Sequence, residues 1–440
     1  MKQRSHTATA FDEVEKRMMN LSHSGIRPGL SRIARLLEGV GHPERSFPAV
    51  HVVGTNGKGS TSAFIESVLR YAGLKTALYT SPHLTHFGER LRVGGDILDP
   101  DAWHHAIDLL ESVLRKNGEA PTFFEVSTAA AFLLAANENV EIAVVEAGLG
   151  GRLDATNILS RVLVSVITTI GLDHEKYLGD SLAGVAGEKF AVLRPGGKSC
   201  FAGGDEKLEK MYSDRCNLLK NQGIILSSAA TWAVTKIDPG GTRFDASCMG
   251  KTYRDLKTGL IGRHQAANAV NAMAALTLFP AGTVSVSEEQ MREGFRIARL
   301  PGRFDIRRTK DHTIILDGAH NPQGTAALVK AISDLSLEGE ISIIFASMKD
   351  KDYRQSLDHL KRTGGDLFLT RVSGMERSAE PSYLLEAAQS GEGWPAAAKA
   401  VESPAGALEE ALKRNRTVLC CGSLYLLSEI LSLTDPAEMG

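Results

Sequence analysis

The fold is decided by the stretch Val50-His51-Val52-Val53-Gly54-Thr55-Asn56-Gly57-Lys58-Gly59-Ser60. An apolar segment with the composition of a β-strand leads into a glycine-rich turn, and residues 61–70 then read as a helix that ends at Gly73. Strand, glycine turn, lysine, hydroxyl and helix form the arrangement that holds nucleotide phosphates. Backbone N–H groups converge on the anion, the helix N-terminus adds positive potential, and the lysine reaches the outer phosphates. We therefore predict nucleotide binding by Asn56, Gly57, Lys58, Gly59 and Ser60.

The match to the strict phosphate-loop pattern has two departures. That pattern requires a glycine where this chain has Val52, and a Ser or Thr directly after Lys58. Here Gly59 follows the lysine and Ser60 comes one place later. On this stretch alone, a tight turn between a strand and a helix is the alternative interpretation.

Composition limits the classes of function. With 440 residues the chain is expected to form two or three domains, and 43% hydrophobic and 23% charged residues are ordinary for a globular protein. The net charge of −2 gives no basic signal for nucleic acid or membrane binding, so we expect neither partner. Any anionic substrate must be met by local groups.

The cysteines and the chain's apolar runs bear on its location. Five cysteines are an odd number without metal-type spacing, and the adjacent Cys420 and Cys421 lie in an apolar run that favours a core position over a metal site. The N-terminus lacks the apolar region of a signal peptide, and no apolar run is long enough to span a bilayer. We therefore expect a reducing, cytoplasmic location.

Three further apolar segments end in polar residues. Residues 75–79 lead to Ser81, residues 142–146 end at Glu146, and residues 162–170 lead to His174. In a doubly wound sheet the loops at the carboxyl ends of strands line the ligand crevice, and a carboxylate beside a phosphate loop commonly holds Mg²⁺. The alternatives are a plain turn at Ser81, a helix cap or salt bridge at Glu146, and an ordinary loop histidine at His174.

Other polar residues have ordinary structural interpretations when the local pattern alone is considered. By pattern alone Arg32 is a surface residue at a helix start, Lys189 is a surface lysine, and Asn268 is a buried polar residue on a helix. Glu125 follows two aromatic residues, which indicates either a charge at a helix N-terminus or an aromatic slot.

The second half of the chain predicts further structure. Alternating patterns at 231–237 and 244–253 indicate a small antiparallel sheet, and Leu300-Pro301-Gly302-Arg303-Phe304 interrupts a helix as a linker would. Apolar segments at 313–316, 341–345, 366–370 and 417–421 indicate a second α/β domain. We predict an α/β protein with a P-loop ATPase-like domain at 1–298, a linker at 299–304 and a Rossmann-like domain at 305–440. The first domain would hold a mostly parallel sheet and the small antiparallel one.

Several motifs together resemble one family. They are Gly-Thr-Asn-Gly-Lys-Gly-Ser-Thr at 54–61, Gly-Leu-Gly-Gly-Arg-Leu-Asp-Ala-Thr-Asn at 148–157 and Asp-Gly-Ala-His-Asn-Pro at 317–322. This series is similar to the Mur ligase superfamily, and within it to bacterial folylpolyglutamate synthases and dihydrofolate synthases of the bifunctional type. The resemblance extends from Gly29 to about Glu429.

The resemblance implies a two-metal site. One Mg²⁺ would be held by Ser81 and Glu146, and a second by His174 and by a carbamate that CO₂ forms on Lys189. Glu146, His174 and Lys189 would then be the catalytic residues. A neutral lysine can capture CO₂ and so become an oxygen ligand suited to Mg²⁺. Many relatives read Lys-Ala-Gly-Ile, whereas this chain reads Lys189-Phe190-Ala191-Val192, so the lysine is kept but its packing differs.

The resemblance also implies sets of ligand-binding residues. ATP would contact Asn268, Arg303, Asp317 and His320 in addition to the glycine loop. The pterin-bearing substrate would be held by Gly29, Leu30, Ser31, Arg32, Thr122, Phe123, Phe124, Glu125, Leu153, Asp154 and Ala155.

The implied activity is that of an ATP-dependent amide ligase, expected to act as a monomer. It would add L-glutamate to dihydropteroate and then to reduced folates through an acyl phosphate. An enzyme with only the polyglutamate activity is the nearest alternative. A peptidoglycan-precursor ligase and a nucleotide-dependent switch without chemistry are more distant ones. A nucleotide-dependent switch would need only the phosphate loop and Glu146, so His174 and Lys189 would have no function in it.

Overall fold

The computed structural model describes residues 2–23, 25–117, 120–390 and 393–434. Two compact units interleave along the chain. The first comprises Met1–Ala233, Asp245–Lys257 and Ala267–Ala298, and the second comprises Val234–Phe244, Thr258–Ala266 and Arg299–Gly440. The units differ from the division at 1–298 and 305–440 because two short central segments belong to the second unit. The domain boundaries themselves stay a prediction.

The first unit contains an eight-stranded sheet in the order β4-β3-β2-β5-β1-β6-β7-β8. Neighbours from β2 to β8 run parallel, while β3 and β4 are antiparallel additions at one edge. The strands are β1 (Ala49–Val53), β2 (Thr76–Tyr79), β3 (Leu91–Val93), β4 (Asp96–Ile97), β5 (Ile142–Glu146), β6 (Val162–Ile167), β7 (Lys198–Phe201) and β8 (Gln222–Ile225).

Strand β1 lies inside this sheet and every one of its residues is buried. Val52 is in register with Glu146 of β5 on one side and with Val166 of β6 on the other. Because these strands are parallel, the phosphate loop, Glu146 and the loop after β6 emerge at the same edge of the sheet. The sheet therefore gathers segments that are about 100 residues apart in sequence.

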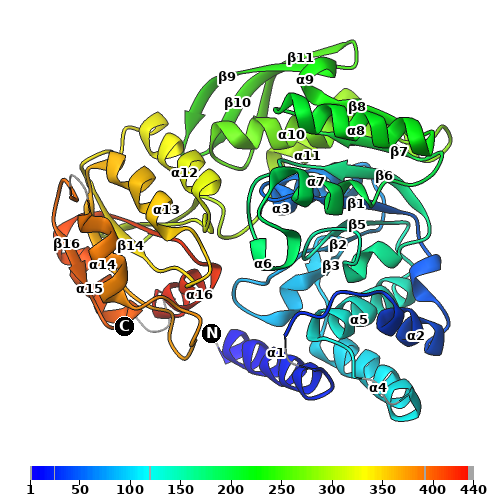
Figure 1. Ribbon diagram of the computed structural model, residues 1–440, viewed down its shortest axis with the longest axis horizontal. Coiled ribbons are helices and arrows are strands. Elements are labelled where there is room, and N and C mark those ends of the chain that lie inside the picture. The colour runs from blue at the N-terminus through cyan, green and yellow to red at the C-terminus, as the bar shows by residue number, and fades with distance from the viewer. Residues whose placement is uncertain (1, 24, 118–119, 391–392, 435–440) are drawn as a thin grey trace. The chain divides into compact units, whose positions relative to one another are not determined.

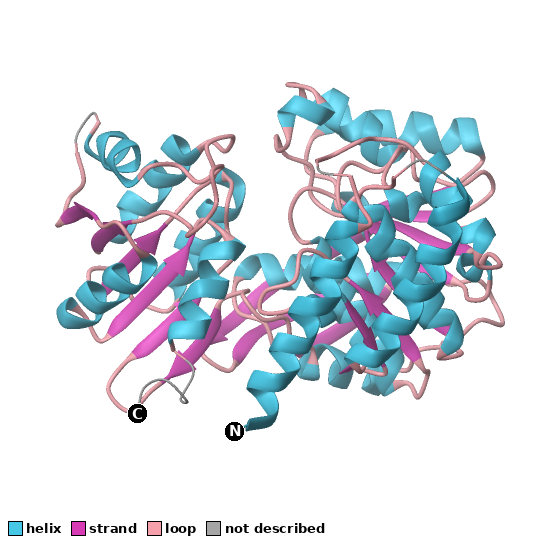
Figure 2. Ribbon diagram, turned by 90° about the horizontal axis from the view of Figure 1, so that it is seen from below, coloured by secondary structure: helices cyan, strands magenta, loops and turns pink. Residues whose placement is uncertain are grey.

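Helices lie on both sides of the first unit's sheet (Figure 2). Helix α3 packs against α11 and strands β1, β2 and β5, while α1, α2, α4 and α5 surround a separate apolar cluster. The helices are α1 (Lys2–Asn20), α2 (Ser31–Gly39), α3 (Lys58–Tyr71), α4 (Pro100–Asn117), α5 (Phe123–Asn137), α6 (Glu175–Leu178), α7 (Leu182–Phe190), α8 (Glu206–Leu219), α9 (Leu226–Ala229), α10 (Arg263–Thr277) and α11 (Glu288–Ile297). Short 3₁₀ helices are η1 (Pro43–Arg45), η2 (Phe87–Arg90) and η3 (Ala155–Ile158).

A small three-stranded sheet has the order β11-β10-β9. Its strands are β9 (Ala230–Asp238), β10 (Gly241–Cys248) and β11 (Lys251–Thr258), and the sheet is antiparallel, as predicted. Strand β10 alternates between buried and half-buried residues, which is the pattern of a strand with one covered face.

The second unit contains a six-stranded sheet in the order β12-β13-β17-β14-β15-β16. Figure 1 labels β14 and β16 of this sheet and the helices α12, α13, α14, α15 and α16 of the same unit. All neighbours are parallel except β12 and β13. Helices α12, α13 and α14 pack in succession, and α15 packs with α16. The elements are β12 (Asp305–Arg308), β13 (Thr313–Leu316), α12 (Pro322–Asp334), β14 (Ile341–Phe345), α13 (Tyr353–Leu360), η4 (Lys361–Thr363), β15 (Asp366–Leu369), α14 (Pro381–Gln389), β16 (Ala398–Ala400), α15 (Pro404–Arg414), β17 (Thr417–Cys421) and α16 (Leu424–Leu433).

The predicted fold class is confirmed: a large, mostly parallel sheet, a small antiparallel sheet and a C-terminal α/β unit are all present. All five cysteines are free and buried, so Cys420 and Cys421 are core residues. Among the described residues, no helix is both long and apolar enough to cross a membrane.

Candidate active site

The phosphate loop connects β1 to α3, and its glycines are sterically required. Gly57 has a φ of 84°, and a Cβ there would lie 2.4 Å from Asn268 Oδ1. A Cβ on Gly54 would lie 1.7 Å from Thr168 Oγ1. The first N–H groups of α3 have no partner within their own helix, and Lys58 Nζ reaches back 3.3 Å to the Thr55 carbonyl. This geometry suits a phosphate group.

Replacement of Gly57 by alanine is expected to raise the Kd for an ATP analogue about tenfold or more. A side chain in the left-handed region costs about 1 kcal/mol or more, and relief of the Asn268 clash requires the loop to shift. Calorimetric titration would measure the change. Gly73→Ala is the matched control, because Gly73 has a φ of 92° but no heavy atom within 4 Å of an added Cβ. The control should lose stability but keep nucleotide affinity, and equal affinities for the two variants would contradict the prediction.

Lys189 lies directly under this loop. Its Nζ donates to the Gly54 carbonyl oxygen at 2.8 Å, and the residue is only 3% exposed. Burial, together with the nearby Lys58 cation, lowers the pKa of Lys189 to about 7, although Asp173 and Asp154 act in the opposite direction. The interpretation of Lys189 as a surface lysine is therefore wrong. A large neutral fraction of this amine is present near neutral pH.

The glycine string at 148–157 packs on α7 next to Lys189. A Cβ on Gly151 would lie 2.7 Å from the Glu188 carbonyl oxygen and 3.2 Å from Lys189 Cα. Arg152 N donates to that same carbonyl, and Arg152 Nη2 pairs with Glu188 Oε1 at 2.9 Å. Glycine at position 151 thus permits the close approach of the two backbones.

The loop after β6 is tied to the phosphate loop by hydrogen bonds. Thr55 N donates to the Thr169 carbonyl, Thr55 Oγ1 donates to the Gly171 carbonyl, and Gly171 N donates to Thr55 Oγ1. His174 follows with a φ of 54°, and its Nε2 lies 4.0 Å from Asp173 Oδ1. The charge of Asp173 acts on Lys189. The predicted His174 and Lys189 therefore belong to segments that both contact the phosphate loop.

Ser81 and Glu146 are adjacent, as expected from neighbouring parallel strands. Ser81 N lies 3.4 Å from Glu146 Oε2, and Glu146 is 6% exposed. A carboxylate beside a hydroxyl-bearing residue offers the hard oxygen ligands that Mg²⁺ prefers. The described part of the chain contains no group of three His, Cys, Asp or Glu side chains placed to bind a metal. A hydroxyl, a modified lysine or phosphate oxygens would have to complete any site.

Two of the predicted substrate segments are joined by a buried ion pair. Arg32 Nε and Nη2 lie 3.0 and 2.9 Å from the two carboxylate oxygens of Glu125. Arg32 is 9% exposed and Glu125 is 3% exposed, so the surface interpretation of Arg32 is wrong. Glu125 also accepts from Thr122 N, and Thr122 Oγ1 accepts from Glu125 N, which caps α5. The helix N-terminal interpretation of Glu125 is therefore correct.

The third predicted substrate segment contacts the same region. Ala155 packs in the apolar cluster against which Leu30, Phe123 and Phe124 also pack. Asp154 Oδ2 accepts from Leu149 N at 2.7 Å and Asp154 Oδ1 accepts from Thr156 N at 3.0 Å. Burial raises the pKa of Asp154, and these hydrogen bonds oppose that effect. The structure thus brings Leu30, Phe123, Phe124 and Ala155, at least one residue from each of the three predicted substrate segments, around one cluster.

The predicted residues of the second unit gather at the carboxyl end of β13. Asp317 accepts from Phe304 N at 2.8 Å and from Ala319 N at 2.9 Å, and His320 Nδ1 lies 2.8 Å from the Gly318 carbonyl oxygen. A Cβ on Gly318 would lie 2.2 Å from Arg303 Nη1. Arg303, Asp317 and His320 therefore lie close together. Their predicted role at the nucleotide, like that of Asn268, stays a prediction.

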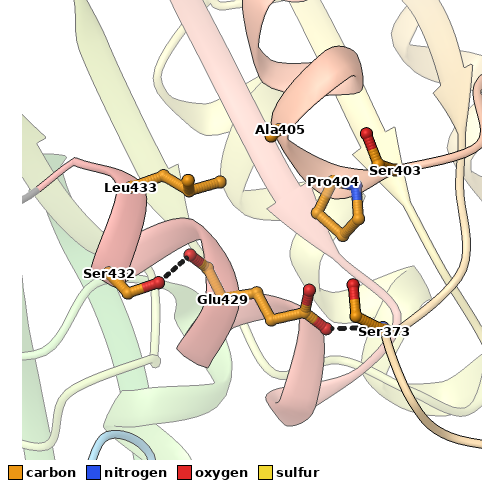
Figure 3. A pocket seen from close by; sticks show the side chains of 7 residues that line it. All are labelled: Ser373, Ser403, Pro404, Ala405, Glu429, Ser432 and Leu433. Carbon is orange, nitrogen blue, oxygen red and sulfur yellow. Dashed lines mark hydrogen bonds between the residues drawn. The ribbon is translucent and has the colours of Figure 1, made fainter.

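A separate cavity of about 250 Å³ lies in the second unit (Figure 3). The Glu429 side chain extends toward Ser373 and accepts a hydrogen bond from Ser373 N at 2.8 Å, while Ser403 and Pro404 at the start of α15 also line the cavity. None of the predicted site residues lines this cavity.

Sequence reasoning missed two residues of the site. Thr55 ties the phosphate loop to the next loop, and Asp173 acts electrostatically on Lys189. Asp173 comes three residues after the apolar segment at 162–170, and Glu146 ends another apolar segment, so a search for acids near the ends of such segments could have singled out Asp173. Thr55 lies within the glycine loop but makes side-chain contacts that no local pattern indicates.

Comparison with known families decides what this site belongs to. Residues 52–276 match the model of the Mur ligase middle domain, and residues 302–424 match the model of the Mur ligase glutamate ligase domain. The chain belongs to the Mur ligase family. The resemblance inferred from the motifs is therefore confirmed.

Curated relatives and solved structures place this Mur ligase more closely. The dihydrofolate synthase/folylpolyglutamate synthase of Bacillus subtilis is 32% identical over 96% of this chain and 98% of its own length. The protein of that name from Escherichia coli is 32% identical, with coverages of 96% and 94%. A structure described as E. coli FolC in complex with DHPP and ADP has a TM-score of 0.85, with 30% identity over 98% of both chains. A Mycobacterium tuberculosis folylpolyglutamate synthase complexed with ADP and AMPPCP has a TM-score of 0.88, with 28% identity and coverages of 97% and 98%.

Proposed function

We propose that this protein is an ATP-dependent ligase that joins L-glutamate to dihydropteroate and then to folates. The observation that carries the proposal is the burial of Lys189 against the Gly54 carbonyl of a phosphate loop. A nucleotide switch would need the loop but not this amine. The two curated relatives above carry both synthase activities in their names, which favours the bifunctional enzyme over one limited to polyglutamate addition.

The proposed reaction has two steps. The acceptor carboxylate attacks the γ-phosphorus of ATP to give an acyl phosphate and ADP, and the amine of glutamate then attacks the acyl carbon and releases phosphate. Both steps bring together groups that repel each other, so neutralised charge and fixed positions supply most of the rate enhancement. Lys58 and the N-terminus of α3 would hold the phosphates. The segments around the Arg32–Glu125 ion pair would hold the pterin-bearing acceptor.

Two Mg²⁺ ions would be held here, one by Ser81 and Glu146, whose side chain lies 3.4 Å from Ser81 N, and the other by His174 and a modified Lys189. Bound Mg²⁺ would offset the negative charge shared by the triphosphate and the acceptor. The neutral amine of Lys189 would attack the carbon of CO₂ and release one proton, which leaves a carbamate. A pKa of about 7 supports this modification because it keeps the amine neutral in part at neutral pH. The location in a reducing cytoplasm is part of the same proposal.

The deciding assay uses dihydropteroate as the sole acceptor with ATP, Mg²⁺ and L-glutamate. Glutamate-dependent release of phosphate with formation of dihydrofolate is the expected result. Turnover only with tetrahydrofolate would indicate the monofunctional enzyme. No turnover with either acceptor would refute the proposed function.

Removal of divalent metal is expected to lower kcat by at least about a hundredfold. The reason is that, without Mg²⁺, only Lys58 and the N-terminus of α3 would offset the negative charge shared by the triphosphate and the acceptor carboxylate. Excess chelator, followed by titration with Mg²⁺, would measure the loss and the recovery in the same sample. Full activity in chelator would contradict the assignment of Ser81 and Glu146 to a metal.

A further inference from the structure

His51 is a fully buried polar residue that the proposed reaction does not yet use. It lies in the middle of β1 and is 0% exposed. Its Nε2 lies 2.8 Å from Thr156 Oγ1, while its Nδ1 meets no hydrogen-bond partner among the residues that the structure describes. A buried ring with half of its hydrogen-bonding capacity unmet is costly in a folded protein, so its one contact calls for an explanation.

The contact of His51 is one link of a directed chain. Thr156 Oγ1 donates to Asp154 Oδ1 at 2.5 Å. Because a threonine hydroxyl has a single proton, Thr156 must accept from His51, and the proton of the imidazole therefore lies on Nε2. The chain runs from His51 through Thr156 to a carboxylate that also accepts from Leu149 N.

The surroundings keep this histidine uncharged. Burial, and to a smaller extent the Arg194 cation, lower the pKa of His51 to about 3. Arg194 Nη2 donates to the carbonyl oxygens of Asn157 and Leu159, directly after Thr156. The ring therefore acts as a neutral hydrogen-bond donor on a rigid strand, with its orientation fixed by close packing.

We propose that His51 is a positioning residue for the acceptor: through Thr156 it fixes the orientation of the Asp154 carboxylate at the pterin-bearing substrate. The inference rests on the proposed function, in which Asp154 belongs to the acceptor site. Strand β1 would then have two roles, because it ends in the phosphate loop and because His51 in its middle donates the hydrogen bond that orients Asp154 through Thr156. Loss of the hydrogen bond from His51 should therefore weaken binding of the pterin-bearing acceptor and leave nucleotide binding unchanged.

Two amide substitutions of His51 test whether the position of the hydrogen-bond donor matters or only the polarity of the side chain. In His51→Gln the amide nitrogen can reach the place of Nε2, whereas in His51→Asn it reaches only the place of Nδ1, which faces no partner. We expect His51→Asn to raise the KM for dihydropteroate about tenfold and to leave the KM for ATP within about twofold of its original value. His51→Gln should keep the KM for dihydropteroate within about threefold.

Ser165→Ala is the matched control. Ser165 lies on β6 directly in register with His51 of β1 and is 0% exposed. It donates a buried hydrogen bond to the Val192 carbonyl, which is not part of the hydrogen-bond series from His51 to Asp154. Its removal should leave both KM values unchanged. If His51→Asn does not fold, Thr156→Val and Thr156→Ser repeat the comparison, because only the serine keeps the hydroxyl.

The outcomes are distinguishable. Equal effects of the two amides on the KM for dihydropteroate, or a parallel rise in the KM for ATP, would overturn the inference and leave the proposed function standing. Absence of dihydropteroate-dependent turnover in the unmodified protein would overturn both. A tenfold rise confined to His51→Asn and to the acceptor would support the positioning role.

Discussion

Replacement of Lys189 by alanine is expected to lower kcat by about a thousandfold or more while the Kd for an ATP analogue stays within about threefold. Alanine cannot form the proposed carbamate, so one of the anionic groups that would hold metal at the γ-phosphate is lost. The predicted nucleotide contacts of Gly57, Lys58 and the N-terminus of α3 would not be changed by this substitution. Phosphate release measures kcat and calorimetric titration measures Kd. Short carboxylates such as acetate or formate should restore part of the activity by entering the space that the side chain leaves.

The control for this variant is Lys75→Ala. Lys75 is a half-exposed lysine that pairs with Glu138 at 2.9 Å, so its loss should leave kcat unchanged. The Lys189 prediction fails if the alanine variant keeps more than a tenth of the original kcat. It also fails if nucleotide affinity falls along with kcat, because Lys189 would then act by supporting the loop.

Replacement of Arg32 by alanine is expected to lower the free energy of unfolding by roughly 3–5 kcal/mol. In the unmodified protein the two charged groups lie within 3.0 Å of each other, and both residues are less than 10% exposed. The substitution therefore leaves the Glu125 carboxylate buried without its cationic partner. The KM for dihydropteroate should rise as well, because the ion pair joins two of the predicted acceptor segments. Urea denaturation followed by circular dichroism would measure the stability.

The double variant Arg32→Met/Glu125→Leu tests the cause of that loss. With both charges removed, most of the lost stability should return, except for about 1 kcal/mol from the cap that Glu125 forms with Thr122. Arg115→Ala removes an exposed pair with Glu111 and should produce no measurable change. An Arg32→Ala variant that is as stable as the original protein would show that the pair contributes little.

The strands could be predicted where apolar residues run without interruption. The expected strand at 142–146 is β5, and those at 341–345 and 417–421 are β14 and β17. The strand expected at 162–170 ends early, at Ile167, and the hydroxyls of Thr168 and Thr169 then donate to the carbonyl oxygens of Val53 and Asn56. The apolar spacing of a helix is visible in the sequence only from Phe11 onward, whereas α1 begins at Lys2.

The site could be predicted at the ends of strands but not in its supporting contacts. Glu146 and Ser81 follow apolar segments, and parallel strands bring such ends to one edge. The burial of Arg32 and Lys189 depends on partners 93 and 135 residues away, so no local pattern distinguishes them from surface cations. The motif resemblance pointed to both residues, and the structure supplies the physical reason for their burial.

The interleaving of the two units has a consequence for how the protein is made. Ile237 and Ile261 pack in the core of the second unit, although both precede residue 299 in the chain. While the ribosome is still translating the last third of the message, these two isoleucines have no core to enter and must stay exposed or be shielded by a chaperone. For the same reason, expression of residues 1–298 alone would produce a fragment with unmatched apolar surface.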